Sequence, residues 1–252
     1  REALDFIHLR SADGRLLIAD FDGAVDGSPP ATLPALAANG PPAGRTTAAL
    51  AVLGPAQQGL LAPALRARVR VPLVATRNAQ PTTRSHEDRA LVLQAGAPVL
   101  AADGRVLAWV QAGVLLNQNL PFIDHINAIV YPDGALPFGS QGTATLFLDD
   151  VRISTNVRLF DGPDTAQGGG GGGGGGGQRA IGTRVSRVVR EAVLGSGGTW
   201  LDRAFVVNDW YMSAYAPLAD AAGQRVGMLY VGYLERPFTW LKYGVLAGIG
   251  GV

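Results

Sequence analysis

The 252-residue chain contains no cysteine, so it can form no disulfide framework and no thiolate metal site. Its three histidines, His8, His86 and His125, lie far apart, and the segment HEDR at 86–89 lacks the second histidine of a zinc-protease motif. We expect all three to be surface or hydrogen-bonded side chains. The sequence therefore predicts no metal site and no cofactor.

Recognisable catalytic motifs are missing as well. No G-x-S-x-G nucleophile elbow is present. Asp149 and Asp150 are adjacent, so in a strand they would point to opposite faces, and aspartate favours turns. Ten consecutive glycines at 168–177 are not followed by the Lys and Ser/Thr of a phosphate-binding loop. We predict no catalytic residue, and we interpret the glycines as a flexible surface insertion without function.

Neither sign of charge is in excess. The chain has 21 basic and 20 acidic residues, a net charge of +1. Binding to nucleic acid requires a basic surface, so we predict no nucleic-acid partner. With 47% apolar and 16% charged residues, the chain can bury the core of one large domain or of two ordinary ones.

No apolar run is long enough to cross a bilayer. The last one, at 243–252, has about half of the roughly 20 residues that a membrane helix needs. Its glycines disfavour a helix in water but are common in membrane helices, and Trp240 and Tyr243 suit a membrane interface. We interpret 239–252 as the start of a truncated transmembrane helix, the alternative being a C-terminal core helix. Because the chain begins at Arg1, we expect it to be a fragment of a longer protein.

What the sequence does contain is an internal repeat. Residues 94–113, QAGAPVLAADGRVLAWVQAG, share their outline with residues 213–232, SAYAPLADAAGQRVGMLYVG. Pro98 aligns with Pro217, and Gly104 with Gly223, at an offset of 119 residues in both cases. Both segments have the pattern of two strands joined by a tight turn. We predict that 91–116 and 211–234 are equivalent strand pairs of two similar modules.

The rest of the chain fits this plan. Each half begins with a hairpin, continues through an irregular or helical crossover and ends with antiparallel strands. The expected elements are hairpins at 6–20 and 143–157, strands at 48–53, 69–75 and 203–208, and helices at 119–130 and 183–194, with Thr183 as the cap of the last helix. The sequence thus predicts an α+β fold of two tandem modules.

The second copy of the repeat carries a polar and aromatic face. Alternation along the strand places Tyr211, Ser213 and Tyr215 on one side. The first copy has Val92, Gln94 and Gly96 at the aligned positions. This face has therefore gained side chains that can hydrogen-bond and stack.

Trp200 and Arg203 lie just upstream, and Arg184 lies near the start of the expected helix, where an anion would be stabilised. We predict that a small ligand binds to these six residues: Trp200, Arg203, Tyr211, Ser213, Tyr215 and Arg184. A carboxylate would be shared by Arg203 and the tyrosines. The alternative is that the tyrosines are core aromatics with satisfied hydroxyls and that Arg184, like Arg187 and Arg190, belongs to a solvated helix face.

Several segments together resemble a known family. The runs TLFLDDVRISTNVRL, RAIGTRVS, LDRAFVVNDWYMSAYAPL and GMLYVGYLE are similar to the extracytoplasmic double Cache sensor domains of bacterial two-component histidine kinases. The resemblance implies two PAS-like modules: a membrane-distal one at 1–118, a helical connector at 119–140, and a membrane-proximal one at 141–238 that contains the glycine insertion.

The resemblance also implies a role. Such a domain is periplasmic, is attached by flanking helices to the inner membrane, binds a small molecule such as an organic acid or amino acid, and works in a receptor that is a homodimer. We therefore expect a non-enzymatic sensing domain of a sensor histidine kinase. The alternatives are the ectodomain of a chemoreceptor or diguanylate cyclase, or a structural or protein-binding ectodomain without a small ligand.

Overall fold

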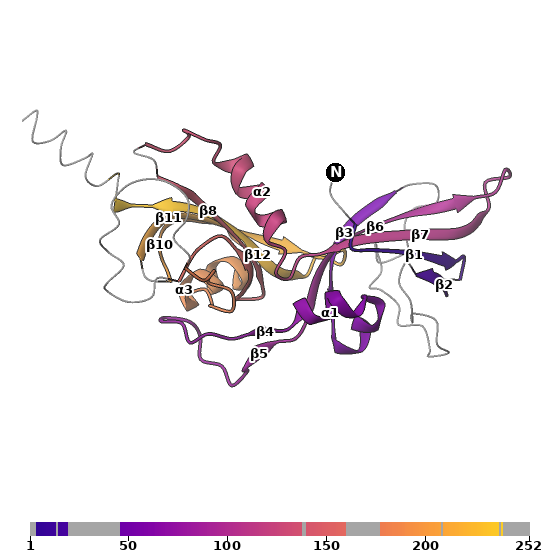
Figure 1. The fold of residues 1–252 in the computed structure, drawn as a ribbon, viewed down its shortest axis with the longest axis horizontal. Coiled ribbons are helices and arrows are strands. Elements are labelled where there is room, and N and C mark those ends of the chain that lie inside the picture. Colours follow the sequence, from indigo (N-terminus) through magenta and orange to yellow (C-terminus); the bar gives the residue numbers. More distant parts are fainter. Residues whose placement is uncertain are drawn as a thin grey trace, which may run out of the picture. The chain divides into compact units, whose positions relative to one another are not determined.

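The computed structural model in Figure 1 describes residues 4–13, 15–19, 46–137, 140–159, 177–207, 209–236 and 238. The chain divides into two compact units, which we call the first and second modules. The first comprises Arg1–Pro72, Arg84–Asn119 and Leu218–Val226, and the second comprises Leu73–Thr83, Leu120–Pro217 and Gly227–Val252.

The first module is built on a five-stranded antiparallel sheet in the order β2-β1-β7-β6-β3 (Figure 1). The strands are β1 (Phe6–Ser11), β2 (Leu16–Ala19), β3 (Thr47–Leu53), β6 (Ala90–Leu100) and β7 (Val106–Leu115). Between β3 and β6 lie η1 (Pro55–Leu60), α1 (Pro63–Val69), β4 (Val71–Pro72) and β5 (His86–Glu87). Phe6, Leu53, Leu61 and Leu115 are fully buried or nearly so in one core cluster.

The strand expected at 69–75 is mostly absent. Pro63 occupies the first turn of α1, where its missing N–H costs nothing, and this helix runs as far as Val69. Only β4 follows it, and its second residue is Pro72, which cannot donate to a sheet ladder. The apolar run that predicted one strand is therefore divided between a helix end and a two-residue strand.

The second module contains another five-stranded antiparallel sheet, in the order β10-β11-β12-β8-β9. Its strands are β8 (Gly142–Leu148), β9 (Val151–Thr155), β10 (Trp200–Val206), β11 (Asp209–Ala219) and β12 (Arg225–Leu234). The helices are α2 (Leu120–Val130) and α3 (Arg187–Arg190), which continues as the π-helical turn η4 (Glu191–Gly195).

Both sheets have the same topology. If the strands of each sheet are numbered one to five along the chain, the first order reads 2-1-5-4-3, and the second reads the same from its β9 edge. The pairs β6–β7 and β11–β12 are then the fourth and fifth strands of their modules. Their turns also match, because Gly104 and Gly223 adopt left-handed φ angles of 82° and 78° and donate to the carbonyls of Ala101 and Asp220. The predicted repeat and the α+β class of two PAS-like modules are confirmed.

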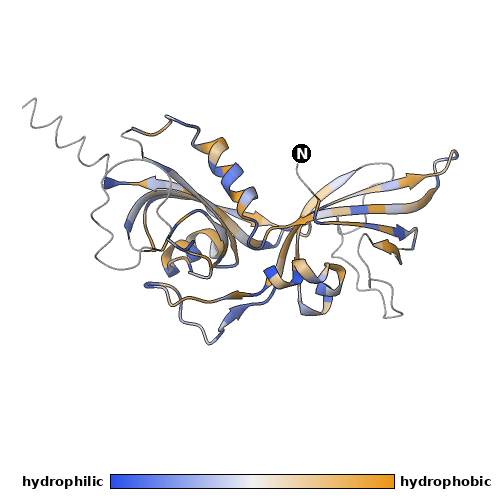
Figure 2. Ribbon diagram, viewed as in Figure 1, coloured by the Kyte–Doolittle hydropathy of each residue, from blue (hydrophilic) through white to orange (hydrophobic). Residues whose placement is uncertain are grey.

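Of the two helices predicted at 119–130 and 183–194, the first forms as expected and the second is shorter. The helix predicted at 119–130 is α2, which carries hydrophobic and hydrophilic residues along its length (Figure 2) and buries Ile123. The helix predicted at 183–194 begins only at Arg187 and is capped by Ser186, whose Oγ accepts from Val189 N. Thr183 is not its cap, because its hydroxyl donates to the carbonyl oxygen of Ala180 at 2.7 Å. Within the described ranges, no helix is both long and apolar enough to span a bilayer, and segment 239–252 lies outside those ranges.

Candidate ligand site in the second module

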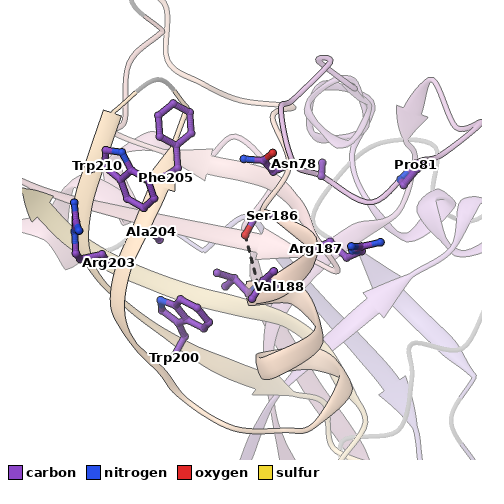
Figure 3. Close-up of a pocket in the computed structure, with 12 residues that line it drawn as sticks. Asn78, Pro81, Ser186, Arg187, Val188, Trp200, Arg203, Ala204, Phe205 and Trp210 are labelled. Carbon is purple, nitrogen blue, oxygen red and sulfur yellow. Dashed lines mark hydrogen bonds between the residues drawn. The ribbon is translucent and has the colours of Figure 1, made fainter.

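A pocket of about 460 Å³ lies beside β10 in the second module (Figure 3). Trp200, Phe205 and Trp210 give it aromatic walls, and Arg203 gives it a cation. The remaining lining residues come from segment 73–83, from the start of α3 and from β10: Asn78, Ala79, Pro81, Ser186, Arg187, Val188, Val189 and Ala204. A pocket with several rings and a few polar groups is the usual setting for a small ligand.

The position of β10 explains why both of its faces contribute. This strand is at the edge of the five-stranded sheet, and β11 is its neighbour there. Successive side chains point to opposite faces, so Trp200 and Ala204 come from one face and Arg203 and Phe205 from the other. The pocket therefore follows the edge of the sheet, as the sticks in Figure 3 show.

Arg203 is held at the pocket by two interactions. Its Nε donates to Glu235 Oε2 at 2.8 Å, and its guanidinium carbon lies 4.9 Å from the centre of the Trp210 ring. About half of the side chain is exposed. The guanidinium keeps further N–H donors beyond the one given to Glu235, and these can reach a ligand carboxylate.

The tyrosines do not share this position. The register pairs Arg203 with Met212, whereas Tyr211 pairs with Ala204 and Tyr215 with Trp200, so Arg203 is on the opposite face from both tyrosines. Tyr211, Ser213 and Tyr215 are at most 4% exposed, and both rings belong to the module's core cluster. The expectation that Arg203 and the tyrosines bind one carboxylate is therefore wrong.

Burial governs the ionisation of these tyrosines. It raises the pKa of Tyr211 and of Tyr215 to about 12, although the nearby Arg152 guanidinium acts in the opposite direction. Burial also raises the pKa of Tyr230, whose ring centre is 4.7 Å from that of Tyr215. All three hydroxyls are therefore protonated and neutral near pH 7.

Arg152 is a residue of this core that sequence reasoning missed. It lies on β9, is 2% exposed, and has its guanidinium carbon 4.9 Å from the centre of the Phe147 ring. In the sequence it follows Asp149-Asp150 and resembles an ordinary exposed residue of a hairpin. Alternation along β9 places Arg152 on the face opposite Ile153. It could not show that Arg152 donates a hydrogen bond to Thr183, 31 residues later.

A comparison with known protein families identifies the family of this chain. The family model described as single cache domain 3 matches residues 114–242, about half of the chain. The chain belongs to the Cache family. The matched region contains all five strands of the second module's sheet.

Two solved structures are similar to this Cache chain in fold. The periplasmic domain of Vibrio cholerae LuxQ is 12% identical, with a TM-score of 0.40, and 92% of this chain aligns with 73% of that one. The ligand-binding domain of the Pseudomonas aeruginosa PAO1 amino acid chemoreceptor PctC, in complex with GABA, is 15% identical with a TM-score of 0.34, over 92% of this chain and 74% of that one. No curated protein matches the sequence.

Arg184, the sixth predicted site residue of the Cache chain, is already engaged. Its Nε and Nη2 both donate to Asp150 Oδ2, at 3.0 and 2.5 Å, and its Nη1 donates to the carbonyl oxygen of Gln80. Asp150 is 1% exposed. Arg184 thus ties segment 73–83 to the sheet and is not among the residues that line the pocket.

Arg190 also differs from expectation. It was expected on a solvated helix face, yet its Nη2 lies 3.0 Å from Asp149 Oδ1. Asp149 itself has a φ of 51°, a left-handed conformation that aspartate tolerates better than most residues. Arg190 therefore anchors α3 to the β8–β9 turn.

Proposed function

We propose that this Cache chain is an extracytoplasmic small-molecule sensing domain of a membrane-bound receptor, specifically a sensor histidine kinase. In that setting the domain is periplasmic, membrane helices flank it, and the receptor works as a homodimer. It binds its ligand without converting it chemically. The pocket beside β10 carries the proposal, because it combines three aromatic walls with the half-exposed cation Arg203.

The ligand class follows from these groups. The rings of Trp200, Phe205 and Trp210 favour a compact apolar or cationic body, and Arg203 favours a carboxylate. Small organic acids and amino acids have both parts. To signal, such a ligand must bind one arrangement of the module more tightly than another, since equal affinity for both would shift nothing.

Isothermal titration calorimetry of the purified chain against a panel of amino acids and small organic acids tests the proposal. Arg203→Ala should weaken the binding of a hit about ten- to a hundredfold, because a charge-assisted bond contributes roughly 1.5–3 kcal/mol. Trp200→Ala should weaken it through the lost stacking surface. Leu201→Ala is the matched control, since Leu201 is 81% exposed and does not line the pocket.

If Arg203→Ala and Trp200→Ala leave the affinity unchanged but Arg89→Ala abolishes binding, the ligand site lies in the first module. That result would contradict the assignment to the pocket beside β10. No binding across the panel would favour a second candidate, a structural or protein-binding ectodomain without a small ligand. The buried packing of Tyr211 and Tyr215 is the observation that favours that candidate.

A further inference from the structure

The two edges of the second module's sheet differ in how they are covered. Along β9, segment 177–185 covers the edge: Arg152 N donates to the carbonyl oxygen of Thr183, and Gly182 N donates to that of Arg152, both at 2.9 Å. Along β10, no described residue outside the β10–β11 pair forms a backbone–backbone hydrogen bond with Trp200–Val206. The β10 edge is therefore open to the addition of an extended chain.

The register determines which backbone groups lie on this open edge. Val206 and Asp209 are separated by two residues, so they are the hydrogen-bonded pair that closes a two-residue hairpin. Outward-directed backbone groups then alternate back along the strand, at Phe205, Arg203 and Leu201. The N–H of Arg203 is already covered, because it donates to Asp202 Oδ1 at 2.6 Å. The N–H groups of the other two residues are available to a partner strand.

The space beyond this edge is a slot with a fixed far wall. The pocket of about 460 Å³ lies there, with β10 on one side and Asn78 and Ser186 on the other (Figure 3). Arg187 N donates to the carbonyl oxygen of Asn78 at 2.8 Å, and Ala79 forms an antiparallel bridge with Ser186. A ligand therefore binds without having to order this wall around itself.

The side chains around the slot indicate which residues an added strand would carry. Both charged residues that line the pocket, Arg203 and Arg187, are cations. A residue paired with Arg203 lies on the same face as the guanidinium, so an acidic side chain there forms a cross-strand ion pair. Its two neighbours point to the other face, where Trp200 and Ala204 offer apolar surface. The slot thus matches an acidic residue between two apolar ones.

We propose that the pocket beside β10 binds a short extended peptide, which joins the sheet as an antiparallel strand and places an acidic side chain at Arg203. This inference rests on the proposed sensing function and narrows its ligand class from free amino acids to peptides. Backbone bonds to Leu201 and Phe205 supply affinity, and the side-chain contacts supply specificity. A single amino acid can reach Arg203 but cannot span both backbone positions, which are roughly 13 Å apart along the strand.

Calorimetric titration of the whole chain with the blocked peptide acetyl-Ala-Val-Glu-Val-Ala amide tests the added strand. With the glutamate opposite Arg203, the alanine N–H groups face β10 and the valine N–H groups face away. N-methylation of both alanines removes two bonds and should weaken binding roughly ten- to a hundredfold, at about three- to tenfold for each bond. N-methylation of both valines is the matched control and should leave the affinity nearly unchanged.

Protein variants test the same contacts from the other side. Leu201→Pro removes an outward N–H, which an edge strand tolerates, and should weaken binding of the parent peptide about three- to tenfold. Leu201→Ala keeps that N–H and should bind as the wild type does. Arg203→Ala should weaken binding about ten- to a hundredfold, and replacing the peptide's glutamate by glutamine should have a similar effect. If Leu201→Pro does not fold, the two methylated peptides on the wild type decide the question.

Equal affinities for the two methylated peptides, or an unchanged affinity in Arg203→Ala, would overturn the inference. If the wild type binds a free amino acid through Arg203 but does not bind the pentapeptide, the added strand is wrong and the proposed sensing function stands. If it binds neither, the inference falls together with the assignment of this pocket as a ligand site.

Discussion

At the scale of single residues, the balance around Arg203 determines how the pocket receives a ligand. Glu235 already accepts a 2.8 Å hydrogen bond from Arg203 Nε and so competes with any ligand carboxylate. Because exposed ion pairs contribute only about 0.2–1 kcal/mol, this competition is weak enough for a ligand to win.

Glu235→Gln should therefore strengthen carboxylate binding by up to about fivefold, the equivalent of roughly 1 kcal/mol. Calorimetric titration with a carboxylate hit gives the comparison. Glu191→Gln removes the same charge from a residue that does not line the pocket and should leave the affinity unchanged. Equal or weaker binding in Glu235→Gln would show that Arg203 does not hold the carboxylate.

The buried tyrosines predict a pH dependence of stability. The pKa of Tyr211 and Tyr215 is about 12 in the folded chain, compared with 10.0 when exposed, so the folded state holds these protons more tightly than the unfolded state does. Their contribution is fully present below pH 10 and is lost as the pH rises from about 10 to 12. Urea unfolding between pH 9 and 11 should show this loss, and Tyr215→Phe should reduce its slope. An unchanged slope would mean that Tyr215 ionises as freely in the folded chain as in the unfolded one.

At the scale of the elements, the repeated turn is a backbone feature that can be tested cleanly. Gly104 and Gly223 both have positive φ, and an added Cβ at either position would have no neighbour within 4 Å. The only cost of a side chain there is the left-handed conformation, about 1–2 kcal/mol. Gly104→Ala and Gly223→Ala should thus lower the free energy of unfolding by similar amounts in denaturant titrations.

Gly59→Ala is the control for this pair. Gly59 also has open space around it, but it lies in η1 without a left-handed φ, so alanine there should be neutral or slightly stabilising. If the two turn variants are as stable as Gly59→Ala, the turns do not need their glycines.

The elements also show how far sequence can reach. Alternation within a strand correctly placed Tyr211, Ser213 and Tyr215 on one face, since that pattern depends only on local geometry. Arg203 was assigned to them because it is close in sequence, whereas the β10–β11 register decides its face. Arg152 could not be found at all, because its burial depends on Thr183 and on tyrosines from two other strands. Long-range pairing, rather than residue type, made that part of the site unpredictable.

At the scale of the whole molecule, the ten glycines at 168–177 interrupt the sequence of the second module. The described residues on either side of it already pair with each other: Leu159 N donates to the carbonyl oxygen of Gln178 at 2.8 Å, and Arg158 forms an antiparallel bridge with Arg179. Arg179 is fixed further by two bonds to Asp124 on α2, at 2.7 and 2.8 Å. The segment that joins Leu159 to Gln178 therefore begins and ends at residues that already pair with each other.

Replacing the ten glycines by a two-residue turn should therefore preserve the fold. The connection between Leu159 and Gln178 becomes roughly half as long, which lowers the entropy cost of closing it by about 0.6 kcal/mol. Urea unfolding should show equal or slightly higher stability. A clear fall in Tm would instead show that the glycines have a structural role, and the polar bonds at Arg158 and Arg179 would then depend on the length of the connection.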